Sequence, residues 1–173
     1  MGIKKFVVLA VALLLPLQVM AYSVEREYDE FTKQEKVYQE GNSPKGSATD
    51  FDLWFMKDKD GNVDLSMRIE YSSDSYLFVR ALDEAVVFLV DGEPIKFITG
   101  RVKRDFSRYS RSVRRYEWFF IFLTRESLDK LCNANELKCR IYGLKYYDEF
   151  DGFEKVQKRW KEFIAEYVDK ADE

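Results

Sequence analysis

The chain has 173 residues, a formal net charge of −3 and no histidine. Without histidine it cannot build a Ser-His-Asp or Cys-His catalytic site, and its two cysteines are too few for the usual zinc sites. A mildly acidic chain is not a general nucleic-acid binder either. We therefore expect no cofactor, no metal and no nucleic-acid partner.

The N-terminal part has the layout of a cleavable secretory signal peptide, residues 1–21. Two lysines precede an unbroken apolar run over residues 6–15, and cleavage is expected between Ala21 and Tyr22. The apolar run is shorter than the about 20 residues that span a bilayer, although an uncleaved anchor is an open alternative. We predict an exported protein, periplasmic or secreted. Its mature part, residues 22–173, should be one domain without a transmembrane segment.

The first half of this domain predicts strands. Residues 22–40 fit either a helix or an edge strand, and we favour the strand, whereas the Gly-, Ser-, Asn- and Pro-rich residues 41–49 predict a loop. Residues 51–56 and 63–71 alternate apolar with polar side chains, as half-buried strands do. An Asp-Gly pair between these two segments predicts a hairpin turn.

Further strands are expected on both sides of a basic stretch. Residues 85–90 are continuously apolar, so both faces of this strand should be covered, and residues 95–99 return after a second Asp-Gly turn. Residues 101–115 predict a basic strand-turn-strand unit. The six apolar residues 118–123 predict a central strand with something packed on each face.

The C-terminal part predicts a short helix near residues 125–133, a strand over residues 137–141 and an amphipathic helix near residues 152–169. The apolar stripe of the second helix comprises Phe153, Val156, Trp160, Phe163, Ile164 and Tyr167. Because the strands before residue 124 are joined by short connections, they should pair antiparallel. The expected fold is mainly β, either a β-sandwich or a strongly bent antiparallel sheet.

Four local patterns lie within residues 85–145. They are the Asp91-Gly92 turn, Tyr116-Glu117 at the start of a strand, Leu128-x-x-Leu131-x-x-Ala134, and Arg140-Ile141-x-Gly143. With these patterns the region resembles a family of uncharacterised exported bacterial β-rich proteins. The resemblance implies a β-rich exported domain, and it implies no activity and no site.

The two cysteines have two interpretations. Cys132 should lie on the inner face of the short helix and Cys139 on the inner face of the next strand. The intervening turn could bring their Cα atoms within bridging distance, and an oxidising compartment favours a disulfide. The alternative is two small buried apolar side chains.

The basic stretch is the only surface feature that we nominate for binding. Its candidate binding residues are Arg104, Arg108, Arg111, Arg114 and Arg115. The guanidinium fork binds phosphate or carboxylate groups in bidentate fashion, so an anionic envelope component or an acidic protein surface would suit it. The alternative is a solvated hairpin whose charges prevent edge-to-edge aggregation.

These observations favour an exported, non-enzymatic binding domain that contacts a protein or an envelope component. Two other functions stay open. One is an inhibitor or immunity protein that blocks an envelope enzyme or toxin. The other is a hydrolase that uses carboxylates, which would need two acids at a defined separation in a concave site, one of them with a raised pKa.

Overall fold

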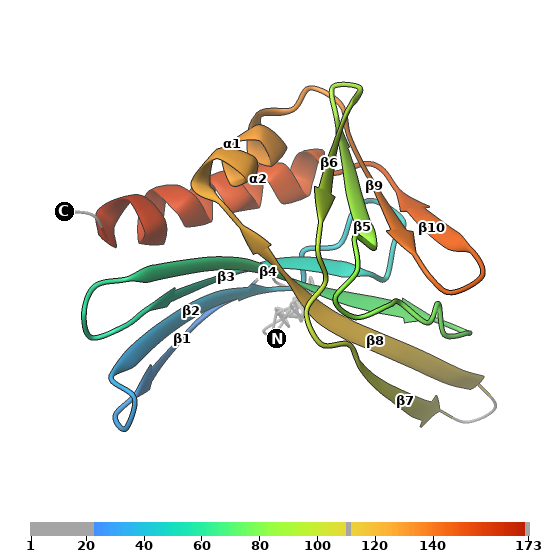
Figure 1. Cartoon of the computed structure of the whole chain (residues 1–173), viewed down its shortest axis with the longest axis horizontal. Helices are drawn as coiled ribbons and strands as arrows, with labels where there is room; N and C mark the ends of the chain where they lie inside the picture. Colours follow the sequence, from blue (N-terminus) through green and yellow to red (C-terminus); the bar gives the residue numbers. More distant parts are fainter. Residues whose placement is uncertain (1–22, 110–111, 172–173) are drawn as a thin grey trace, which may run out of the picture.

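The computed structural model describes residues 23–109 and 112–171, which form two antiparallel sheets and two helices (Figure 1). In spatial order the six-stranded sheet consists of β1 (Ser23–Asp29), β2 (Gln34–Glu40), β3 (Asp50–Lys57), β4 (Val63–Ser73), β8 (Ser112–Leu123) and β7 (Lys103–Tyr109). The four-stranded sheet consists of β10 (Tyr147–Phe150), β9 (Leu137–Tyr142), β5 (Val86–Val90) and β6 (Glu93–Phe97). The prediction of a mainly β fold built on a bent antiparallel sheet is confirmed.

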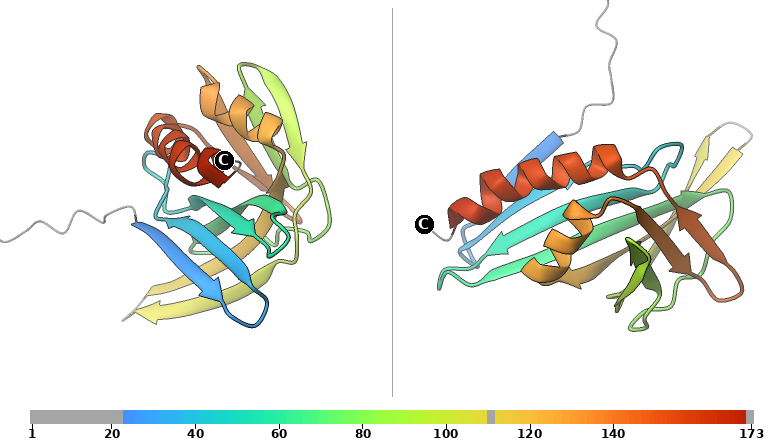
Figure 2. Two further views of the ribbon diagram at one scale, coloured as in Figure 1. Left: turned by 90° about the vertical axis from the view of Figure 1, so that its left-hand side faces the viewer. Right: turned by 90° about the horizontal axis from the view of Figure 1, so that it is seen from above.

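Both helices lie on one side of the six-stranded sheet, together with the four-stranded sheet (Figures 1 and 2). Helix α1 (Arg125–Asn133) begins after Thr124, whose side chain accepts a hydrogen bond from the Ser127 amide. Helix α2 (Glu154–Phe163) continues into a π turn, Ile164–Val168, and a 3₁₀ turn, Asp169–Ala171. The predicted apolar stripe of this helix is buried except for Tyr167, which is half-buried.

The core is shared by both sheets and the C-terminal helix. The ring of Phe51 on β3 lies 6.1 Å from that of Phe88 on β5 and 5.1 Å from that of Phe153, which precedes α2. Trp160 of α2 donates a hydrogen bond of 3.0 Å from Nε1 to the Phe51 carbonyl oxygen. All four residues are almost fully buried, so one aromatic cluster joins the three layers of the molecule.

The prediction that residues 118–123 are covered on both faces is wrong. Phe119 and Ile121 are buried, but Phe120 is half-buried and Phe122 is 69% exposed. The described helices and the four-stranded sheet all pack on the inner face of the six-stranded sheet. In the described part of the chain, neighbouring side chains such as Trp54 shield the outer face of β8, and the Trp54 ring lies 5.2 Å from that of Phe120. The same correction applies to β5, where Leu89 is 37% exposed.

Two features of the sheets were not predicted. The segment at residues 22–40 folds into a hairpin of two strands, β1 and β2, rather than a single edge strand. Strand β10 was missed because its four residues, Tyr147–Phe150, alternate too briefly to be recognised. It forms one edge of the four-stranded sheet through its pairing with β9.

Candidate binding surface

The inner face of the β7–β8 hairpin, which continues the core side of the six-stranded sheet, combines cations with apolar side chains. The buried Glu117 and Phe119 identify the inward side of β8, because alternate residues of a strand point to the same side. The β7–β8 register then places Arg104, Phe106, Arg108, Val113 and Arg115 on this inner face. Phe106 lies between Arg104 and Arg108 on this face and is 60% exposed.

The outer face of the same hairpin is polar and cationic. Lys103 lies there, with its Nζ 4.5 Å from the centroid of the Trp118 ring. Arg114 is opposite Ser107 in the register, and the Ser107 hydroxyl lies 3.3 Å from the hydroxyl of Tyr116. Strand alternation therefore divides the predicted arginines between two faces that one flat ligand cannot contact together.

A buried carboxylate holds the guanidinium of Arg104 against the protein. Its Nε lies 2.9 Å from Oε1 of Glu117, which is 0% exposed, and its Nη2 donates to the Val79 carbonyl oxygen at 2.8 Å. Glu117 also accepts hydrogen bonds from the amides of Phe78 (2.8 Å) and Val79 (3.1 Å). Arg104 therefore helps to position a loop, and its nomination as a contact residue stays a prediction.

The loop that Glu117 holds, residues 74–85, presents apolar side chains in a strained conformation. Phe78 and Leu82 have φ angles of 58° and 59°, a left-handed conformation that bulky residues rarely adopt. Their side chains are nevertheless 49% and 80% exposed. A glycine allows the loop to approach the four-stranded sheet, because a Cβ at Gly143 would collide with the Leu77 carbonyl oxygen.

The same loop borders the inner face of the hairpin. Tyr76 donates a hydrogen bond of 3.1 Å from its hydroxyl to the Asp105 carbonyl oxygen on β7. Arg115 donates from Nη1 to the Asp74 carbonyl oxygen, and its Cζ lies 5.7 Å from the centroid of the Tyr76 ring. The guanidinium of Arg115 is thus partly occupied, and the loop bounds one side of the exposed Phe106.

The other three predicted arginines are Arg108, Arg111 and Arg114. Arg108 on the inner face and Arg114 on the outer face are both exposed, and neither has a hydrogen-bond or ion-pair partner among the residues that the structure describes. Arg111 lies outside the described residues. The sequence pattern therefore located the cationic hairpin. It could not distinguish Arg104, which binds Glu117 of the same chain, from Arg108 and Arg114, which have no such partner in the described residues.

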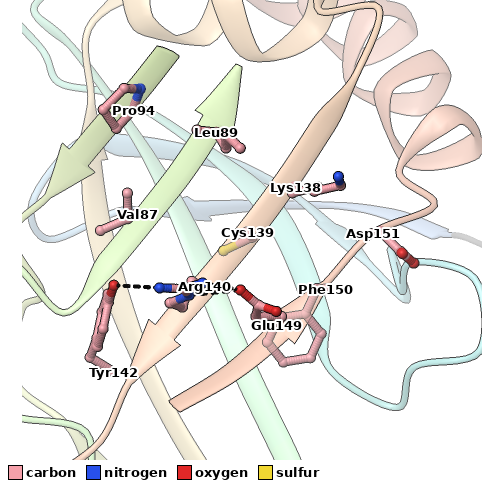
Figure 3. A pocket seen from close by; sticks show the side chains of 10 residues that line it. All are labelled: Val87, Leu89, Pro94, Lys138, Cys139, Arg140, Tyr142, Glu149, Phe150 and Asp151. Carbon is pink, nitrogen blue, oxygen red and sulfur yellow. Dashed lines mark hydrogen bonds and ion pairs between the residues drawn. The ribbon is translucent and has the colours of Figure 1, made fainter. Parts of the chain in front are cut away.

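A hollow of about 690 Å³ lies on the outer face of the four-stranded sheet (Figure 3). Arg140 is at its centre, but its guanidinium is already engaged. Its Nε donates to Glu149 at 2.8 Å, its Nη1 donates to the Tyr142 hydroxyl at 3.1 Å, and its Cζ lies 4.2 Å from the centroid of the Tyr147 ring. The charges in this hollow neutralise one another, so it is a weaker candidate than the hairpin.

One carboxyl group has the raised pKa that a carboxylate hydrolase would need, but it is not accessible. Burial raises the pKa of Asp52 to about 7, although Asn42 donates hydrogen bonds to it from its backbone and its side chain. Asp52 is 3% exposed. A substrate would therefore have no direct access to this carboxyl group.

The cysteines are both buried and both free. Cys132 lies on the inner face of α1 and Cys139 on the inner face of β9, as the periodicity predicts. Burial raises the pKa of the Cys132 thiol to about 12 and that of Cys139 well above its usual value. The structure thus agrees with the second interpretation, two small apolar side chains, rather than with a disulfide.

Several predictions concern the ends of the chain and bound ions. The expected signal peptide and its cleavage site at Ala21 and Tyr22 lie outside the described residues. Within residues 23–109 and 112–171 no helix is long and apolar enough to cross a membrane. The described residues also contain no group of three or more Cys, Asp or Glu side chains placed to hold a metal ion.

Comparison with protein-family models gives no match, and comparison with curated proteins gives none either. The resemblance of residues 85–145 to an exported bacterial family therefore stays a prediction.

Proposed function

We propose that this protein is a binding domain, not an enzyme, and that its β7–β8 hairpin docks an anionic partner, either an envelope component or a protein. The observation that carries the proposal is that Arg108 and Arg114 are exposed and lack a partner in the described part of the chain. Buried or paired arginines serve the fold, whereas unpaired exposed ones are available to phosphate or carboxylate groups.

The shape of the molecule supports the same proposal. In Figure 1 the β7–β8 hairpin extends beyond the strands that pack against the helices. Arg108 and Arg114 lie on this extension, so a partner can reach them without displacing core elements. If residues 1–21 are a signal peptide, as the sequence predicts, this partner lies in the periplasm or outside the cell.

Binding to polyglutamate and to phosphatidylglycerol vesicles at low and high salt tests the proposal. The doubly substituted variant Arg108→Glu/Arg114→Glu should lose at least about tenfold in affinity for the probe that binds. The affinity of the unaltered protein should fall as salt rises, because exposed charges are screened.

The matched control is Lys145→Glu/Lys155→Glu, which makes the same change of charge at two other exposed positions. This variant should bind nearly as well as the unaltered protein. Equal losses in the two double variants would show that net charge, not the hairpin, controls binding. Binding that ignores salt and the hairpin variant would overturn the proposal.

A further inference from the structure

We infer that the inner face of the β7–β8 hairpin receives an extended, acidic segment of a partner protein that also carries apolar side chains. This inference rests on the proposed function and names the partner and the face that it contacts. The strip that it concerns consists of Phe78, Phe106, Arg108 and Arg115.

The chemistry of the strip favours a ligand that is both anionic and apolar. Phe106 and Phe78 are 60% and 49% exposed, and Arg108 lies two residues from Phe106 on the same face of β7. Two carboxylates contact the backbone of the strip: Glu117, which is buried and paired with Arg104, and Asp105, which accepts a hydrogen bond of 2.7 Å from the Phe106 amide. Among the described residues neither of them pairs with Arg108. A partner with carboxylates alone would leave both rings uncovered, and an uncharged partner would leave Arg108 unpaired.

The spacing of the strip matches an extended polypeptide. Phe106 and Arg108 are alternate residues of one strand, so their side chains recur at about 6.6–6.8 Å. Alternate side chains of an extended partner segment recur at the same distance. Arg115 lies directly opposite Phe106 on β8 and adds a second row to the strip.

The border of the strip argues against a membrane surface as the partner. Loop residues 74–85 lie along the inner face, tied to the hairpin by the Tyr76 hydrogen bond to Asp105 and by the Arg115 contact with Asp74. A flat bilayer that approaches the inner face would meet this loop as well as the strip, and it could not contact the cations of the outer face at the same time. A narrow chain segment can lie beside the loop and contact one face.

The inference also explains the conformational strain in the loop, because the strained conformation fixes the position of Phe78. Its left-handed φ of 58° is maintained by the hydrogen bond from its amide to Glu117, and the Arg104 Cζ lies 5.6 Å from the centroid of its ring. Strain of this kind persists where the surrounding structure imposes it, and it concentrates at binding sites. Arg104 and Glu117 are thus positioning residues for an apolar contact.

The test uses three fluorescein-labelled peptides of equal length. The first alternates Glu with Phe and Ser, the second has every Phe replaced by Ser, and the third has every Glu replaced by Lys. We expect the first peptide to bind best, the second about tenfold more weakly, and the third not at all. Fluorescence anisotropy measures all three affinities, and circular dichroism confirms that each protein variant is folded.

Substitutions on opposite faces of the hairpin separate this inference from the broader proposal. Arg108→Ser and Phe106→Ser should each weaken the first peptide by about tenfold, whereas Lys103→Ser and Phe122→Ser should change its affinity less than about twofold. Lys103 is the cationic control on the outer face of β7, and Phe122 is an exposed phenylalanine far along β8.

Three results would overturn the inference. Equal losses for Arg108→Ser and Lys103→Ser would leave the hairpin as an anion-binding element without a preferred face. Binding to phosphatidylglycerol vesicles but to none of the peptides would leave the proposed function and assign it to a lipid surface. Failure to bind either kind of probe at any salt concentration would overturn both the inference and the proposed function.

Discussion

The Glu117 carboxylate joins the β7–β8 hairpin to the loop that follows β4. It accepts from two consecutive amides of the loop at residues 74–85 and pairs with Arg104, and it does so while fully buried. A buried charge is tolerated only where it is paired and hydrogen-bonded, since desolvation is costly. Glu117 therefore holds together a loop and a hairpin that are far apart in the chain.

Replacing Glu117 should be strongly destabilising. Glu117→Ala leaves two amides and a guanidinium without their acceptor, so the free energy of unfolding should fall by about 3–5 kcal/mol. Glu117→Gln keeps one carbonyl acceptor and should lose less. Urea denaturation measures both, with Glu93→Ala at an exposed position as the control. A similar loss in Glu117→Ala and Glu93→Ala would contradict the account of this residue.

Asp52 makes stability depend on pH in a defined direction. Burial raises its pKa in the folded protein to about 7, whereas the pKa of an aspartate in an unfolded chain is about 3.9. Between these values the folded state holds a proton that the unfolded state has released. The contribution of Asp52 to the free energy of unfolding therefore falls as pH rises from about 4 to about 7, and is constant above that.

The substitution Asp52→Asn should remove this decline, because the amide keeps an acceptor for Asn42 and does not ionise. Relative to the unaltered protein the variant should become more stable as pH rises from about 4.5 to about 7.5, by about 2–4 kcal/mol. Urea denaturation at several pH values measures the difference. Asp60→Asn, at an exposed turn, should leave the pH dependence as it is. A constant difference across the pH range for Asp52→Asn would contradict the expectation.

The connection from α1 to β9 carries both cysteines, and local sequence patterns place each of them on a buried face. Thr124 and Ser127 form a reciprocal capping box that begins the helix. Cys132 and Leu131 then lie on its buried face, and Cys139 faces the core from β9. Periodicity thus brings two cysteines into the core. Whether they bond depends on the separation of the two elements, which no local pattern determines.

The free thiols lead to a simple chemical expectation. In the folded protein neither Cys132 nor Cys139 should react with a water-soluble disulfide reagent, because burial holds both as unreactive thiols. After unfolding without reductant, both should react. Absorbance of the released thiolate counts them. Finding no reactive thiol in the unfolded, unreduced protein would show that they form a disulfide.

The whole molecule has one shared core rather than a core for each sheet. Phe51 contacts the rings of Phe88, Phe150 and Phe153, which belong to the four-stranded sheet and the approach to α2. A core shared in this way couples the layers, so the domain should unfold in a single cooperative transition. Trp160, buried against the same cluster, reports on this transition through its fluorescence.

Phe51→Ala tests that coupling. It should lower the free energy of unfolding by about 3–5 kcal/mol and shift one transition that far-UV circular dichroism and tryptophan fluorescence report alike. The same substitution at Phe122, which is 69% exposed, should cost less than about 0.5 kcal/mol. Two separate transitions, or equal costs at the two positions, would argue against a shared core.

The sequence by itself determined the local structure and the location of the cationic hairpin. Alternation predicted β3 and β4, the stripe from Phe153 to Tyr167 predicted the C-terminal helix, and the basic run marked β7 and β8. These features depend on side chains a few residues apart, which share a face of a strand or helix. Such patterns are visible without knowing what the face packs against.

Only the tertiary structure decided which faces are covered and which arginine is available. The apolar run of β8 suggested two covered faces, but the helices and the second sheet lie on the same side, so Phe122 is exposed. Arg104 and Arg108 are equivalent in the sequence pattern. They differ because Glu117 forms an ion pair with Arg104. Glu117 also accepts a hydrogen bond from the amide of Phe78, which is 39 residues away in the chain. Contacts at that separation depend on how distant segments pair, and local periodicity carries no information about such pairing.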